Sequence, residues 1–166
     1  MCFFSTMIYL GLGSNLGNRL QNIYRAYSLI EFYLGKIIKK SSIWESEPCG
    51  FKSSNMFYNS VCCIDNNFNS VRNILTLTLK IEKEMGRIKS CVEYEDRIID
   101  IDIIAIDNKI VNTDDIQIPH PKMHLRRFVL LPFYEIEQNW KHPIFNKTII
   151  ELINDCPDNS KIRKLI

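Results

Sequence analysis

Hydrophobic positions along the chain alternate between strand-like and helix-like spacing, which indicates a protein of mixed α and β structure. Short apolar runs rich in β-branched residues predict strands at residues 7–13, 37–44, 57–64 and 98–106. Apolar residues at helical spacing predict helices at residues 20–34 and 71–85, and a glycine directly follows each. Shorter helices are expected near residues 128–135 and 148–155.

The predicted order of strand, helix, strand, strand, helix, strand is that of the ferredoxin-like βαββαβ fold. We therefore expect an α+β fold in which a mainly antiparallel sheet has helices packed on one face. An Asp-Asn-Lys triplet at residues 107–109 predicts a hairpin turn into residues 110–111. No linker or repeat divides the chain, so we expect one domain over residues 1–166, with residues 1–6 either disordered or ahead of the true start.

Composition narrows the classes of function. With 46% hydrophobic and 24% charged residues the chain is expected to be globular, and its net charge of +2 is too small to predict a nucleic-acid or membrane-surface partner. The opening residues do not fit a signal peptide, no apolar run is long enough to span a membrane, and the six cysteines form no CxxC pair. We expect a cytoplasmic monomer with reduced thiols.

Two aspartates interrupt the most apolar predicted strand. Asp100 and Asp102 are two residues apart, so their carboxylates project to the same side of a strand. Two unpaired carboxylates on a largely buried strand would each cost several kcal/mol. A Mg²⁺ ion, which binds one or two carboxylates together with substrate phosphates, would offset that cost. The alternative is that both aspartates only pair with Arg97 and another basic residue on a solvated surface.

Basic residues stand on both sides of this strand in the sequence. Arg87, Lys89 and Arg97 bracket the polar loop before it, where they could hold polyphosphate oxygens, although a basic loop is more often simply solvated. After the strand, His120 lies between two prolines, which argues against the helix that a zinc pair with His124 would need. We favour His120 as a phosphate donor or a structural residue.

Two further segments carry candidate binding features. The glycine-rich residues 11–17 match neither dinucleotide nor P-loop spacing and are equally well explained as a turn. Phe57 and Asn59 share one side of their predicted strand. A flat heteroaromatic ring could stack on Phe57 and hydrogen-bond to Asn59, although core packing of Phe57 is the simpler explanation.

Together these segments resemble the hydroxymethyldihydropterin pyrophosphokinases. Residues 97–104, Arg-Ile-Ile-Asp-Ile-Asp-Ile-Ile, resemble the family signature R-x-x-D-[LIV]-D-[LIVM]-[LIVM]. Four supporting segments occur in the family's order, at residues 11–17, 57–59, 81–87 and 119–128. The resemblance extends from about residue 7 to residue 152.

The resemblance implies transfer of diphosphate from ATP to 6-hydroxymethyl-7,8-dihydropterin in folate biosynthesis, with in-line attack on the β-phosphorus and release of AMP. It implies that Asp100 and Asp102 bind two Mg²⁺ ions and act in catalysis with Arg87, Lys89 and Arg97. The implied ATP-binding residues are Glu82, Arg87, Lys89, Arg97, Ile103, Gln117, His120 and Arg126. The implied pterin-binding residues are Ser46, Glu47, Cys49, Phe57, Asn59, Asp100 and Phe128.

The chain also departs from the family pattern. Family members commonly carry a basic-aromatic pair and Gly-Pro before the signature arginine, whereas residues 93–96 are Glu-Tyr-Glu-Asp here. Glu47 replaces a frequent proline, and Pro121 a frequent tyrosine. The polar loops at residues 45–55 and 87–96 are expected to close over the substrates. A metal-dependent phosphohydrolase using the same aspartates and a non-catalytic RNA-binding module are the alternative functions.

Overall fold

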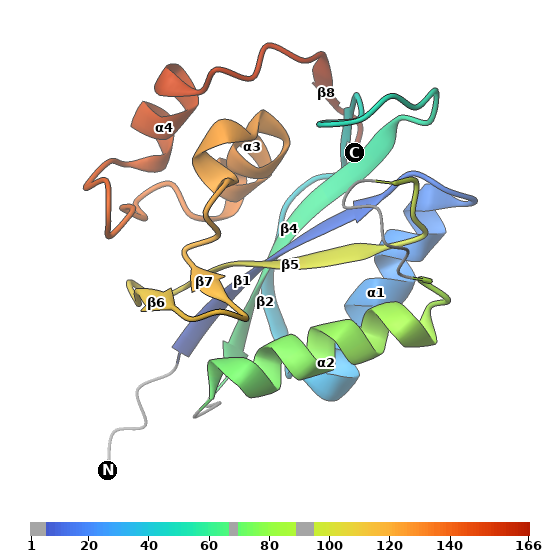
Figure 1. Cartoon of the computed structure of the whole chain (residues 1–166), viewed down its shortest axis with the longest axis horizontal. Helices are drawn as coiled ribbons and strands as arrows, with labels where there is room; N and C mark the ends of the chain where they lie inside the picture. Colours follow the sequence, from blue (N-terminus) through green and yellow to red (C-terminus); the bar gives the residue numbers. More distant parts are fainter. Residues whose placement is uncertain (1–5, 67–69, 89–94) are drawn as a thin grey trace.

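The computed structural model describes residues 6–66, 70–88 and 95–166 (Figure 1). The first part of the fold consists of β1 (Thr6–Ser14), α1 (Arg19–Tyr33), β2 (Ile37–Lys40), β3 (Trp44–Ser46), β4 (Phe57–Asn66), α2 (Val71–Glu84) and β5 (Asp100–Ile106). The second part consists of β6 (Val111–Asn112), β7 (Gln117–Ile118), a 3-10 turn (Met123–Leu125), α3 (Arg127–Ile136), α4 (Ile149–Asp155) and β8 (Ile162–Lys164). Within the described ranges, no helix combines the length and the apolar character needed to cross a membrane.

The main sheet has the strand order β5-β1-β4-β3-β8, and β2 also pairs with β4. All of these pairs are antiparallel. β2 and β3 together correspond to the second strand of the predicted βαββαβ unit, so β4 is its third strand and β5 its last. β1, the first strand, lies between β4 and β5. The predicted α+β fold with a mainly antiparallel sheet is confirmed.

Alternate residues of the strands point to opposite faces of the sheet; one face packs against α1 and α2 and the other against α3, on which α4 packs in turn (Figure 1). Ile8 and Leu10 of β1 are fully buried on the face covered by α1 and α2. Tyr9, between them, packs on Phe133 of α3 at 4.8 Å between ring centroids. Full burial of one such aliphatic side chain contributes roughly 1.5–3 kcal/mol, so slippage of β1 by one residue would be costly. The two helices of the predicted βαββαβ unit, α1 and α2, thus share one face, and α3 covers part of the other.

The predicted strand at residues 37–44 is divided into β2 and β3. At the break, the Ser41 hydroxyl accepts a hydrogen bond from the Val61 amide at 2.9 Å. The next amide, that of Ser42, donates to the Glu135 carboxylate of α3 at 2.8 Å. Side chains thus bind two backbone amides at the point where β2 ends, and the strand is interrupted before β3.

The turn predicted at residues 107–109 is present, since the Lys109 amide donates to the Ile106 carbonyl at 2.9 Å, but the predicted hairpin pairing is wrong. Asp107 extends the pairing with β1, because its amide donates to the Met7 carbonyl and its carboxylate accepts from the Met7 amide. The next strand, β6, pairs with β7 and not with β5. β8, whose Ile-Arg-Lys sequence is too polar to be predicted as a strand, pairs with the outer edge of β3.

Candidate active site

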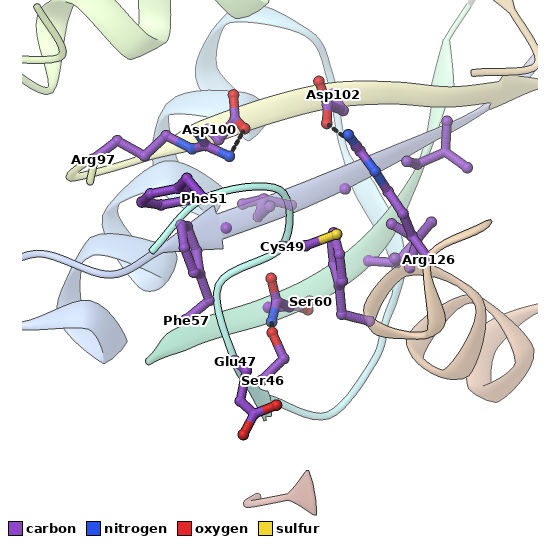
Figure 2. A pocket seen from close by; sticks show the side chains of 18 residues that line it. Ser46, Glu47, Cys49, Phe51, Phe57, Ser60, Arg97, Asp100, Asp102 and Arg126 are labelled. Carbon is purple, nitrogen blue, oxygen red and sulfur yellow. Dashed lines mark hydrogen bonds and ion pairs between the residues drawn. The ribbon is translucent and has the colours of Figure 1, made fainter. Parts of the chain in front are cut away.

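A cavity with aromatic walls, which we call the aromatic cavity, lies on the sheet face that α3 partly covers (Figure 2). Gly11 and Gly13 of β1 lie on this face, so two successive inward positions carry no side chain. A Cβ atom on Gly11 would lie only 2.9 Å from the Ile104 side chain. The glycines leave an open floor, and Phe57 of β4 and Phe128 of α3 line the walls above it.

The polar edge of the aromatic cavity comes from β3 and β4. The Asn59 amide donates a 2.9 Å hydrogen bond to the Ser46 hydroxyl, and both residues are buried. Phe51, in the loop after β3, packs edge-on against Phe57 at 6.2 Å between ring centroids. This edge combines a fixed amide with an aromatic surface, which suits a flat ring with polar substituents.

A second cavity, which we call the basic cavity, adjoins the first. Its lining includes four cationic side chains, two carboxylates and one imidazole, from Arg87, Arg97, Lys122, Arg126, Asp100, Asp102 and His120. Four of these residues also line the aromatic cavity, namely Arg97, Asp100, Asp102 and Arg126. Molecules bound in the two cavities would therefore meet at the aspartate pair.

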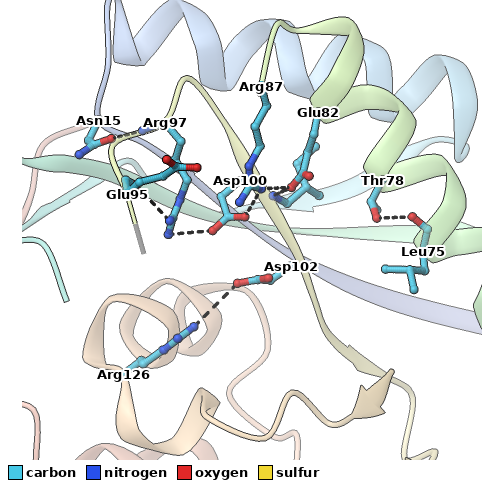
Figure 3. A network of polar contacts seen from close by, with 11 residues as sticks. Asn15, Leu75, Thr78, Glu82, Arg87, Glu95, Arg97, Asp100, Asp102 and Arg126 are labelled. Carbon is cyan, nitrogen blue, oxygen red and sulfur yellow. Dashed lines mark hydrogen bonds and ion pairs between the residues drawn. The ribbon is translucent and has the colours of Figure 1, made fainter. Parts of the chain in front are cut away.

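Asp100 and Asp102 project from the same side of β5 into both cavities (Figure 3). Asp100 forms ion pairs with Arg87 and Arg97, and the Arg97 Nη2 lies 2.9 Å from the Asp100 Oδ2. The Asp100 side chain is 19% exposed, so water screens these charges only in part. β5 thus places one carboxylate between two guanidinium groups.

Asp102 is less well compensated than Asp100. Its ion pair with Arg126 spans 3.8 Å, and 39% of its side chain is exposed. Enclosure by the protein, and then the charge of Asp100, raise the pKa of Asp102 to about 7 despite that exposure. A raised carboxylate pKa in a cavity is typical of a functional site, and here it favours binding of a cation.

Glu82 of α2 holds Arg87 at the wall of the basic cavity (Figure 3). Glu82 is 3% exposed, and its Oε1 accepts hydrogen bonds from the Ile101 amide at 2.8 Å and from Arg87. Burial alone would lower the pKa of Arg87, but the charges of Asp100 and Glu82 raise it. The Arg87 guanidinium is therefore charged and fixed in place by two carboxylates.

His120 contributes a neutral group to the basic cavity. Its Nδ1 accepts a hydrogen bond from the Lys122 amide at 3.1 Å, so the neutral ring carries its proton on Nε2. Burial, and then the charge of Arg126, lower the pKa of His120 to about 4. At neutral pH the ring is an uncharged N–H donor, which can bind a phosphate oxygen without adding charge.

Known proteins identify the family of this site. The family model described as 7,8-dihydro-6-hydroxymethylpterin-pyrophosphokinase (HPPK) matches residues 9–138. The chain belongs to the HPPK family. The 2-amino-4-hydroxy-6-hydroxymethyldihydropteridine pyrophosphokinase of Aquifex aeolicus is 37% identical over 144 residues, which cover 87% of this chain and 88% of that protein.

Longer relatives and solved structures also match this HPPK chain. The folic acid synthesis protein fol1 of Pneumocystis carinii is 36% identical over 152 residues, which are 92% of this chain but 20% of that protein. The chain likewise spans 24% of the Dictyostelium discoideum folic acid synthesis protein FOL1. A crystal structure of wild-type Plasmodium falciparum HPPK-DHPS is 18% identical, with a TM-score of 0.72 over 91% of this chain and 44% of that chain. At that identity the likeness establishes the HPPK fold alone.

The residues predicted to bind the pterin in this HPPK chain come together in the structure. All seven line the aromatic cavity, namely Ser46, Glu47, Cys49, Phe57, Asn59, Asp100 and Phe128. The Glu47 carboxylate nevertheless turns away from the cavity in Figure 2 and accepts from the Lys161 amide at 3.2 Å. Phe51 and the two glycines were not predicted from the sequence to be part of this cavity. Glycines at alternate positions 11 and 13 of a predicted strand could have indicated an open floor on one face.

The predicted ATP residues are only partly brought together. Arg87, Arg97, His120 and Arg126 line the basic cavity. Glu82 reaches it through Arg87, and Lys89 lies outside the described residues.

Ile103 and Gln117, which were predicted to shape the nucleoside site, lie outside the two cavities, and their role stays a prediction. Ile103 lines neither cavity, because the alternation of β5 turns it away from Asp100 and Asp102 into the core beneath α1 and α2. Gln117 is exposed on β7 and lines a separate hollow beside His120.

The residues present fit a magnesium site completed by substrate. The described part of the chain holds no group of three or more His, Cys, Asp or Glu residues that could bind a metal. Mg²⁺ differs from zinc in this respect, since it is usually held by one or two carboxylates, water and substrate phosphates. Asp100 and Asp102 supply two oxygen donors on one side of β5, and the one ion pair that the described residues give Asp102, with Arg126, spans 3.8 Å.

Proposed function

We propose that this HPPK chain transfers the terminal diphosphate of ATP to the hydroxymethyl group of 6-hydroxymethyl-7,8-dihydropterin, in a Mg²⁺-dependent step of folate biosynthesis. The products are AMP and the pterin diphosphate. One observation carries the proposal beyond family membership: the aromatic cavity and the basic cavity meet at Asp100 and Asp102. A two-substrate transfer needs such a junction between its donor and its acceptor.

The aromatic cavity is the proposed pterin site. A flat bicyclic ring would stack on Phe57 and Phe128 above the glycine floor, while the Asn59 amide reads its polar edge. Stacking on a rigid aromatic wall fixes the plane of the ring. The hydroxymethyl group would then point toward the aspartate pair.

The basic cavity is the proposed triphosphate site. Its four cationic side chains outnumber its two carboxylates, so its charge suits a polyphosphate. Arg87 and Arg97 form ion pairs with Asp100. We propose that phosphate oxygens take over these guanidinium groups and leave Asp100 for the metal.

The transfer forms a bond between the hydroxymethyl oxygen and the β-phosphorus and breaks the bond from that phosphorus to the α-phosphate oxygen. AMP leaves, and the hydroxyl proton is released to solvent. Two bound Mg²⁺ ions, with Asp100 and Asp102 as protein ligands, would supply charge neutralisation and polarise the phosphate oxygens. Arg97, Arg126 and His120 hold and orient the phosphates, so catalysis rests on positioning and needs no covalent nucleophile.

Three further expectations belong to the same proposal. The protein acts in the cytoplasm as a monomer, with ATP and the pterin as its partners. The loops at residues 45–55 and 87–96 close over the bound substrates. Hydrogen exchange in the described parts of both loops should slow when an unreactive ATP analogue and the pterin bind together, and unchanged exchange would contradict closure.

The proposal is tested by incubating the protein with Mg-ATP and 6-hydroxymethyl-7,8-dihydropterin and separating the products. We expect AMP and pterin diphosphate in equal amounts, and no turnover in Asp100→Ala or Asp102→Ala variants that keep the fold. Release of phosphate without a need for pterin would indicate a phosphohydrolase instead. Lack of turnover together with RNA binding would indicate the non-catalytic module.

A further inference from the structure

A hydrogen-bonded cluster centred on Asp96 joins three segments beside the site. The Asp96 Oδ1 accepts from the Asn15 side-chain amide, and the Oδ2 accepts from the Asn55 side-chain amide, both at 2.6 Å. Ser53 belongs to the same cluster, because its hydroxyl accepts from the Asn55 backbone amide at 3.1 Å and its side chain lowers the pKa of Asp96. Asn15 lies in the turn between β1 and α1, whereas Ser53 and Asn55 lie in the loop between β3 and β4. One carboxylate thus ties both segments to the residue before Arg97.

The cluster continues into the backbone of Arg97. Asn15 is buried, and its Oδ1 accepts from the Arg97 amide at 2.7 Å (Figure 3). The Asn15 backbone amide donates in turn to the Arg97 carbonyl at 3.1 Å. These two contacts fix the amide and the carbonyl of Arg97, on either side of its Cα atom. The direction in which the Arg97 side chain leaves the backbone therefore depends on Asn15, which Asp96 holds in place.

Both cavities depend on the residues that this cluster holds. The Arg97 guanidinium pairs with Asp100 at 2.9 Å and lies 5.2 Å from the centre of the Phe57 ring. Phe57, in turn, begins β4 two residues after Asn55. The Asp96 carboxylate therefore links the loop that leads into the aromatic wall with the arginine shared by the two cavities.

We propose that Asp96 is a positioning residue, which fixes the loop before Phe57 to the Arg97 backbone and so sets the geometry between the pterin and phosphate sites. The inference rests on the proposed function and adds a role for a position at which this chain departs from its family pattern. A proline there restricts the backbone but offers no side-chain acceptor. In this chain, a carboxylate that accepts from the side chains of Asn15 and Asn55 holds the same position.

The ionised form of Asp96 is the one that can accept all of these hydrogen bonds. Hydrogen bonds from Ser53, and then from Asn55 and Asn15, hold the pKa of Asp96 below its ordinary value, although burial acts in the opposite direction. At neutral pH both oxygens are therefore acceptors. An asparagine at position 96 would place an N–H donor against the amide donor of Asn15 or Asn55.

A donor–acceptor exchange tests the proposal on the full chain. The variants are Asp96→Asn, Asn55→Asp and the double variant that carries both. Asp96→Asn removes one acceptor, and Asn55→Asp sets two carboxylates against each other. The double variant restores a donor facing an acceptor across the 96–55 contact and keeps an acceptor for Asn15. Asp155→Asn is the matched control for loss of a carboxylate, because Asp155, at the end of α4, forms an exposed ion pair with Lys147.

The readouts are the pterin KM and kcat at saturating Mg-ATP, together with amide hydrogen exchange at Arg97. Each single variant should raise the pterin KM about tenfold, the effect of one lost charge-assisted hydrogen bond, and should speed exchange at Arg97. The double variant should return both readouts most of the way to wild type, and the control should change neither. A role limited to overall stability would lower the melting temperature without this exchange rescue.

Unchanged pterin KM and Arg97 exchange in the single variants, or a double variant no better than either single, would overturn the proposal. Should Asn55→Asp not fold, Asp96→Ala against wild type gives the same two readouts with the same expected direction. If wild type makes no AMP, the proposed function fails, while Arg97 exchange still decides whether Asp96 holds that backbone.

Discussion

Replacing Asp102 by asparagine should stabilise the ligand-free protein while removing its function. The substitution keeps the shape of the side chain and removes a charge whose pKa is raised from 3.8 to about 7 by enclosure and by Asp100. A carboxylate with a raised folded-state pKa holds its proton more tightly in the folded than in the unfolded chain. Its charge therefore destabilises the fold fully above pH 7, and the penalty disappears as the pH falls toward 4.

The size of the effect follows from the exposure of the side chain. For a fully enclosed carboxylate, such a shift in pKa would lower the free energy of unfolding by about 4 kcal/mol, at about 1.36 kcal/mol per pKa unit. Because 39% of the Asp102 side chain is exposed, solvent screening reduces this loss substantially. We expect Asp102→Asn to raise the free energy of unfolding by about 1 kcal/mol at pH 8 and by almost nothing at pH 4, as measured by urea unfolding.

Ligand binding supplies the second half of this prediction. Mg-ATP at 100 times its Kd should add about 2.7 kcal/mol to the free energy of unfolding of wild type and much less to that of Asp102→Asn. Asp155→Asn should match wild type within about 0.5 kcal/mol with and without ligand, because its ion pair is exposed. A variant that is less stable than wild type at pH 8, or that gains the full ligand effect, would refute the reasoning.

Three further predictions address the walls, the floor and the neutral donor of the site. Phe57→Ala should weaken pterin binding about 10- to 100-fold through lost stacking, with Mg-ATP affinity unchanged in a fluorescence titration; equal loss of both affinities would contradict separate sites. Gly11→Val should crowd Ile104 and fill the floor of the aromatic cavity. It should lower the free energy of unfolding by about 1–3 kcal/mol and the pterin affinity by about tenfold or more, and an unaltered pterin affinity would place the ring elsewhere. His120→Asn keeps a neutral donor and should retain Mg-ATP affinity within about threefold in calorimetry, whereas His120→Ala should lose about tenfold. Because the pKa of His120 is about 4, the ring stays neutral from pH 8 to pH 6, and a rise in Mg-ATP affinity caused by His120 over that range would contradict this.

The parts of the fold that follow from sequence are those with a long hydrophobic period. The strand predicted at residues 7–13 is β1 (Thr6–Ser14), and the helix predicted at residues 71–85 is α2 (Val71–Glu84). Short strands escape such reasoning, because β8 is formed through its pairing with β3 and not through its own apolar pattern. The break between β2 and β3 depends on Glu135, which is distant in sequence.

The candidate site also has a part that the sequence predicts and a part that it does not. That Asp100 and Asp102 share one side of a strand follows from the two-residue period alone, and the same period places Ile103 on the opposite face, away from both cavities. The contacts of Phe51 and Asp96 could not be predicted, because they form between loops whose conformations are set by tertiary contacts. Sequence patterns thus located the aspartate pair better than the loops that surround it.

Phosphorus NMR of the complete reaction tests the central claim, the transfer of an intact diphosphate at the junction of the two cavities, most directly. With protein, Mg-ATP and 6-hydroxymethyl-7,8-dihydropterin, the account predicts loss of the three ATP resonances and equal growth of an AMP signal and a coupled pair from the pterin diphosphate, all abolished by a metal chelator. Formation of ADP or free phosphate in place of that coupled pair would contradict it.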